Sequence, residues 1–196
     1  ATLRAQDERQ VDQADADLIA LQKNGANDLI KRLAHRLLGS GRFGRGDFEG
    51  AAQAWRAGIE AFPDDWEMHN NLAYCIGIEL GRPAEAVPLA RQATQLADSR
   101  ADVYDTLGNL LLKSGELDEA EDALLTAKER VRTERERVNV LLNLARLALK
   151  RGNTDEARRL WTDADTAIYT LPDLREVVGD DLAEVKQEID SAPSAD

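Results

Sequence analysis

The sequence predicts an all-α protein built from consecutive helical hairpins, and three periodic features lead to this prediction. Four glycines recur with gaps of 35, 34 and 37 residues: Gly46, Gly81, Gly115 and Gly152. An alanine follows each glycine by five residues, and a leucine precedes each glycine by eight residues, or by nine in the second unit. The residue after each leucine is glycine or alanine. Such a period is typical of a solenoid in which every hairpin packs on its neighbours.

This pattern resembles the tetratricopeptide repeat (TPR), a helix–turn–helix unit, over four units that span residues 32–171. The match is strong at the leucine and small-residue positions. It departs from the family at the aromatic ones, because His35, His69, Tyr104 and Leu141 stand where the family has tryptophan. The resemblance implies a right-handed α-α superhelix with an N-terminal helix and a C-terminal capping helix. It does not identify a subfamily.

The first elements follow from apolar spacing and from helix-stop signals. Residues 1–28 are expected to form an N-terminal helix or half-repeat, since a patchy apolar stripe ends at Asn24 and Gly25. The first repeat covers about residues 29–65. Its first helix has leucine or isoleucine at helical spacing, and Asp47 is a suitable N-cap for its second helix.

The remaining elements continue the same period. The repeats are expected at about 66–99, 101–136 and 138–171, and the extra residues near 131–137 are expected to lengthen the second helix of the third repeat. Pro172 then interrupts the chain. Residues 173–190 are predicted to form a capping helix with one apolar stripe, and residues 191–196 a disordered tail.

Composition argues against several function classes. A net charge of −12 and a pI of about 4.7 disfavour nucleic acid and an anionic membrane surface. The only cysteine, Cys75, lies in an apolar stretch and is expected to be a small buried side chain. His35 and His69 occupy equivalent positions and are expected to pack between helices. We therefore expect no metal, no cofactor and no catalytic site.

The resemblance implies a function in protein–protein interaction, because the first helices of such repeats line a concave groove that holds a peptide or partner segment. Asparagine amides can bind a peptide backbone through both donors and an acceptor. Nine residues are expected to line the groove: Arg36, Phe43, Asn70, Asn71, Tyr74, Asp105, Asn109, Asn143 and Arg146.

Three alternatives stay open. Residues 31–45 are basic and residues 173–190 are acidic, which would allow head-to-tail assembly of copies of the chain. A second alternative is that the chain is the scaffold region of a larger enzyme or of a secretion or assembly complex. A small molecule would need an aromatic-lined pocket, for which Phe43 and Tyr74 are the candidates.

A cytoplasmic location is favoured, and the start at an alanine keeps a periplasmic one open. Most of the basic residues are arginine and alanine is frequent, and this composition suggests a bacterial chain.

Overall fold

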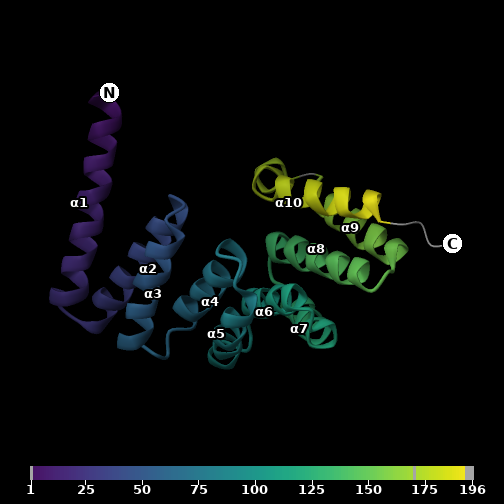
Figure 1. Ribbon diagram of the computed structural model, residues 1–196, viewed down its shortest axis with the longest axis horizontal. Coiled ribbons are helices and arrows are strands. Elements are labelled where there is room, and N and C mark those ends of the chain that lie inside the picture. Colours follow the sequence, from purple (N-terminus) through teal and green to yellow (C-terminus); the bar gives the residue numbers. More distant parts are fainter. Residues whose placement is uncertain (1, 170, 193–196) are drawn as a thin grey trace. The chain divides into compact units, whose positions relative to one another are not determined.

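The computed structural model describes residues 2–169 and 171–192, with side chains described from residue 10 onward, and these ranges contain helices and no strand (Figure 1). The elements are α1 (Thr2–Asn24), α2 (Asp28–Gly44), α3 (Phe48–Ala61), α4 (Trp66–Tyr74), the π-helix η1 (Cys75–Glu79), α5 (Pro83–Leu96), α6 (Ala101–Ser114), α7 (Leu117–Arg130), α8 (Glu134–Lys150), α9 (Thr154–Ile168) and α10 (Pro172–Ser191). The predicted all-α helical solenoid is confirmed.

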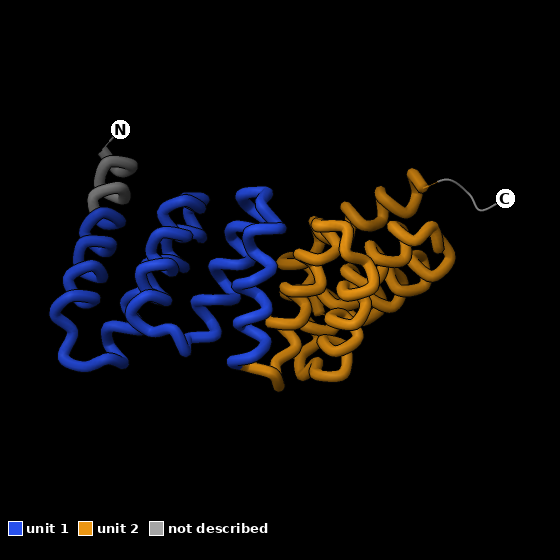
Figure 2. Tube along the Cα trace, turned by 60° about the horizontal axis from the view of Figure 1, so that its bottom comes forward, with its two compact units in different colours: residues 1–96 blue, residues 97–196 orange. Residues whose placement is uncertain are grey.

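The chain divides into two compact units, residues 1–96 and 97–196 (Figure 2). Unit 1 holds α1 and two hairpins, α2/α3 and α4–η1/α5. Unit 2 holds the hairpins α6/α7 and α8/α9 and then α10, which packs on both α8 and α9. Nothing in the repeat pattern itself marks this division.

The four periodic glycines owe their position to backbone conformation. All four have positive φ, between +68° and +84°, and no other described residue does. Each ends the first helix of a hairpin. In the third hairpin Gly115 N–H donates to Leu112, and Glu116 N–H reaches back five residues to Leu111. A side chain disfavours this left-handed region, so the turn selects glycine in every repeat.

The second hairpin contains one extra residue between its leucine and its glycine, and η1 absorbs it. Leu80 N–H donates to the carbonyl of Cys75, five residues back, at 3.0 Å. The final turn is correspondingly longer, with Arg82 N–H bonded to Ile76, six residues back. The insertion is thus taken up as a π-helical turn within the first helix, and the glycine turn is preserved.

Small residues recur because large side chains of the second helices pack against them. A Cβ added to Gly108 would lie 2.6 Å from the side chain of Leu124, and Gly39 faces the indole of Trp55 in the same way. The alanines that follow the turns, Ala51, Ala86, Ala120 and Ala157, are fully buried. A larger residue at these positions would overpack the hairpin.

The extra residues of the third repeat lie elsewhere than expected. The second helix α7 has 14 residues, as α3 and α5 do, so it is not lengthened. The chain instead leaves the helix at Val131, and Thr133 starts a longer α8 through a capping box with Glu136. The prediction of a longer second helix is wrong because this local cap outcompetes continued helix. Of the predicted tail, residues 193–196 lie outside the described residues.

Candidate functional site

A pocket of about 330 Å³ opens between the first helices of unit 1. It is lined by Ser40, Phe43 and Gly44 from α2, Trp55 from α3, and Asn70, Asn71 and Tyr74 from α4. Four of these seven residues, namely Phe43, Asn70, Asn71 and Tyr74, are among the predicted groove residues. The fold therefore brings them together in one hollow, although they lie up to 31 residues apart in the chain.

Three aromatic rings line this pocket, those of Phe43, Trp55 and Tyr74. The centroid of the Phe43 ring lies 6.1 Å from that of Tyr74 and 6.0 Å from that of Trp55. The Phe48 ring meets the Phe43 ring edge-on, with a centroid distance of 5.2 Å. Trp55 is almost fully buried, whereas 38% of Tyr74 is exposed. The pocket thus offers a rigid apolar surface with one ring at its rim, which suits a bulky apolar group.

The polar atoms of the pocket are not all matched. Asn70 Oδ1 and Trp55 Nε1 are buried, and neither has a hydrogen-bond partner. The Trp55 atom lies against the backbone of α2 at Gly39. Unmatched buried polar atoms in a native fold call for an explanation, because leaving one without a partner costs about 1–3 kcal/mol.

Three leucines on α2 remain exposed next to the pocket. Leu29, Leu33 and Leu37 are spaced four residues apart and are 73%, 50% and 49% exposed. In the sequence they belong to the apolar spacing expected of a buried helix face. The structure separates them from the buried face, which carries Ala34 and Leu38. The four-residue spacing of the leucines indicates a helix with an apolar face. It does not indicate which face of the helix the neighbouring helices cover.

Arg36 is already engaged within unit 1. Its guanidinium bonds the buried carboxylate of Asp65 at 2.8 Å and Glu67 at 2.6 Å. Arg32 also reaches Asp65, at 3.4 Å, and Asp64 at 3.0 Å. Asp65 at the same time caps α4 by accepting from Met68 N–H. Arg36 therefore fixes α4 against α2 beside the pocket.

Three of the four predicted groove residues of unit 2 form a hydrogen-bonded cluster instead of a pocket, namely Asp105, Asn143 and Arg146. Asn143, which is 4% exposed, donates to Asp105 at 2.9 Å. Arg146 donates to Asn143 and pairs with Asp181 and Glu184 of α10 at 3.2 and 3.0 Å. Asn109 lies partly exposed on α6. These contacts join α6, α8 and α10.

Burial raises the pKa of Asp105 to about 6, because the charged carboxylate loses hydration. The hydrogen bond from Asn143 and the charge of Arg146 act in the opposite direction, and Asp102 and Asp181 add to the increase. The raised pKa of Asp105 predicts that the stability of unit 2 depends on pH.

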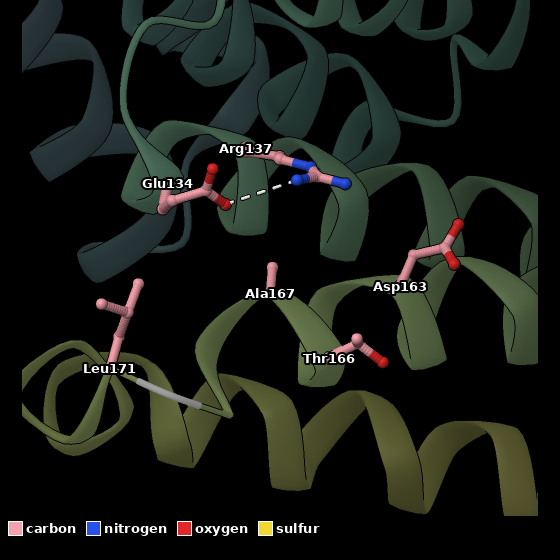
Figure 3. Close-up of a pocket in the computed structure, with 6 residues that line it drawn as sticks. All are labelled: Glu134, Arg137, Asp163, Thr166, Ala167 and Leu171. Atoms are coloured by element: carbon pink, nitrogen blue, oxygen red, sulfur yellow. Dashed lines mark hydrogen bonds and ion pairs between the residues drawn. The ribbon is translucent and has the colours of Figure 1, made fainter.

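A second hollow of about 470 Å³ lies on unit 2 between the start of α8 and the end of α9 (Figure 3). Figure 3 shows Glu134 and Arg137 on one side, joined by an ion pair of 3.5 Å, and Asp163 and Thr166 across from them. Asp163 also faces Arg159 on its own helix, at 3.6 Å. The charged groups here pair largely with neighbours on the same helix, so this hollow has the character of a solvated surface.

The charged ends of the sequence are used for internal contacts. Asp15 of α1 pairs with Arg42 and Arg45, both at 2.9 Å. On α10, Lys186 pairs with Asp190 at 2.6 Å, and the acids near Arg146 pair with that arginine. Several of the charged groups on which head-to-tail assembly would depend are therefore engaged in ion pairs within their own unit.

The cysteine and the histidines are structural in their environment. Cys75 is fully buried, as predicted, and its thiol donates to the carbonyl of Phe48; burial raises its pKa to about 11. His35 and His69 are also buried, and His69 Nε2 lies 3.0 Å from the carbonyl oxygen of Pro63. Among the described side chains, no group of three His, Cys, Asp or Glu is placed to hold a metal. No described helix has the length and apolarity required to cross a bilayer.

Comparison with known protein families agrees with the repeat geometry. Three tetratricopeptide repeat models match residues 32–101, 78–139 and 138–161. The chain belongs to the tetratricopeptide repeat family. Its members are in general non-catalytic scaffolds for protein interaction, and this chain has the fold of such a scaffold. No curated protein matches the sequence.

Solved structures of TPR proteins share the fold at low sequence identity. A structure of pilF from Pseudomonas aeruginosa has a TM-score of 0.64 and 22% identity, covering 84% of this chain and 78% of its own. The structure of TTC0263, a thermophilic TPR protein from Thermus thermophilus, has a TM-score of 0.66 and 19% identity. The match covers 92% of this chain and 95% of TTC0263. The structure of YrrB, described as a TPR protein with an unusual peptide-binding site, has a TM-score of 0.64 and 17% identity. The match covers 93% of this chain and 86% of YrrB.

Proposed function

We propose that this chain is a non-enzymatic interaction module that holds a segment of a partner protein on the first helices of unit 1. The pocket between Phe43 and Tyr74 supports this proposal most directly. It combines exposed aromatic surface with the side-chain amides of Asn70 and Asn71, which supply donors and acceptors to a bound chain. Protein-binding hot spots have this composition, with aromatic anchors surrounded by polar groups.

Two further observations favour unit 1 over unit 2 as the main contact. The exposed leucines of α2 extend the apolar surface beyond the pocket, and contiguous exposed apolar surface commonly marks interaction sites. In unit 2, Asp105, Asn143 and Arg146 are occupied by one another and by α10. The likeness in fold to YrrB, which is described as having a peptide-binding site, agrees with this proposal.

The proposal is tested by affinity capture with matched tyrosine variants. Wild-type chain, Tyr74→Ala and Tyr169→Ala are immobilised, and proteins retained from source-cell lysate are quantified by mass spectrometry. Tyr169 is the control, because it is 77% exposed and belongs to unit 2. We expect a protein that is retained by wild type and by Tyr169→Ala and lost by Tyr74→Ala. Identical sets of proteins on all three would contradict a binding role for the pocket.

A further inference from the structure

The exposed leucines and the pocket lie along one face of α2. At 100° per residue, positions 29, 33, 37, 40 and 44 fall within an arc of about 80° and span about 22 Å of helix. Leu29, Leu33 and Leu37 are exposed, and Ser40 and Gly44 continue the same stripe into the wall of the pocket. The surface is therefore a continuous track with a hollow at its end.

The apolar character of this track determines which backbone can lie on it. Leucine side chains offer no hydrogen bonds, so an extended segment buried there would leave its own N–H and C=O groups unsatisfied at a substantial cost. An α-helix satisfies these groups internally and presents apolar side chains at i, i+4 and i+8. Such side chains can interdigitate with leucines that are themselves four residues apart.

The size of the track favours a short segment over a second copy of the chain. Three partly exposed leucines and one aromatic rim amount to a few hundred Å². A stable dimer buries about 800 Å² on each partner. The arginines beside the track, Arg32 and Arg36, are already paired with acids of the same unit, so they are not available to strengthen contacts with another copy.

The pocket indicates which side chain anchors the segment. A volume of about 330 Å³ between Phe43 and Tyr74 accommodates a large aromatic group. Asn70 also lines the pocket, and its side-chain amide can accept a hydrogen bond from a bound group. Tryptophan and tyrosine combine an aromatic body with an N–H or O–H donor, whereas phenylalanine has no donor.

We infer that unit 1 docks an amphipathic helix of a partner protein, with apolar side chains on Leu29, Leu33 and Leu37 and a tryptophan or tyrosine in the pocket. This inference rests on the proposed function, because it specifies the kind of segment that the site holds. Gly44 makes it testable, since a Cβ added there meets no atom within 4 Å and its φ is not positive. A large side chain at Gly44 should therefore fill the pocket without disturbing α2.

The experiment selects binders from a phage-displayed library of randomised peptides, each about 20 residues long and so about 30 Å as a helix, against the full wild-type chain. The best peptides are then synthesised, and their affinities are measured by fluorescence anisotropy. We expect a consensus with apolar residues four apart, followed by a tryptophan or tyrosine. The peptides should become helical on binding, as seen by circular dichroism.

Matched variants locate the peptide. Gly44→Phe should weaken binding by at least about 30-fold, the loss expected when an anchor is excluded from its pocket, and Gly44→Ala should leave it unchanged. Leu33→Ser should weaken it by about 5-fold to 10-fold, and Leu125→Ser, which alters a similarly exposed leucine of unit 2, should not. Replacing the anchor tryptophan of the peptide by phenylalanine should cost about 5-fold.

The outcomes separate this inference from the function on which it rests. Extended peptides with alternating apolar residues that lose affinity to Leu33→Ser or Gly44→Phe would overturn the helical partner and keep the binding site. Peptides that bind Gly44→Phe and Leu33→Ser as tightly as wild type would overturn both. A library without enrichment would also count against the helical partner, while the lysate capture would still test the site. Thermal unfolding of each variant shows whether it is folded.

Discussion

Asn143 donates a hydrogen bond of 2.9 Å to the carboxylate of Asp105 and thereby joins α8 to α6 across 38 residues of sequence. The sequence pattern predicts that both residues face a ligand. Their pairing in a largely buried position shows that an asparagine at this position can serve the packing of adjacent repeats.

Asp105→Asn is expected to make stability less dependent on pH. The folded-state pKa of Asp105 is raised to about 6, above its unfolded value, so its contribution is fully present below about pH 4 and is lost as pH rises towards 6. Relative to wild type, the variant should gain up to about 3 kcal/mol between about pH 4 and about pH 7. Urea unfolding at both pH values measures this difference. The exposed Asp122→Asn serves as control, and a difference that does not change with pH would refute the prediction.

Asn143→Ala is expected to destabilise the chain by about 1–3 kcal/mol, because it leaves the partly buried carboxylate of Asp105 without its donor. Asn109→Ala, on the partly exposed surface of α6, should change the free energy of unfolding by no more than about 0.5 kcal/mol. Chemical denaturation of the two variants tests this contrast. Equal effects would mean that the Asn143–Asp105 bond has no special weight.

Asp65→Ala is expected to cost about 2–4 kcal/mol, since Asp65 caps α4 and is the buried partner of two arginines. The adjacent Asp64→Ala removes a carboxylate that is 69% exposed, and should cost less than about 1 kcal/mol. Thermal and urea unfolding of both variants give the comparison. A small effect at Asp65 would show that solvent replaces the carboxylate in this network.

Gly115→Ala is expected to destabilise by about 1–2 kcal/mol, because φ at this turn is +84°. Gly44→Ala, at a helical position with open space around the new Cβ, should be neutral or slightly stabilising. Measured unfolding free energies with the same sign for both substitutions would argue that turn conformation does not explain the periodic glycines.

The sedimentation coefficient is expected to stay constant when the salt concentration is raised from about 0.01 M to about 1 M. Arg42 and Arg45 share Asp15, and acids of α10 share Arg146, so part of the charge that head-to-tail contacts would need is already engaged within the chain. Larger species at low salt that dissociate at high salt would establish electrostatic assembly instead.

The repeat architecture could be predicted without the structure, because each repeat uses the same local geometry. A left-handed turn requires glycine, and a close approach between two helices requires a small residue such as Gly108 opposite Leu124. These requirements recur at a fixed period and can be recognised without knowledge of the partner helices. The buried state of Cys75 also followed from its apolar neighbours.

Which polar and apolar groups remain available for binding depends instead on the packing between helices. Leu33 and Leu38 look alike in a helical pattern, yet one is exposed and the other buried, because neighbouring helices cover one face of α2. Arg36 resembles a ligand contact in the sequence, but Asp65, 29 residues away, binds it in the folded chain. Which atoms meet between helices depends on side-chain packing across the repeats, and the spacing within one repeat contains no record of it.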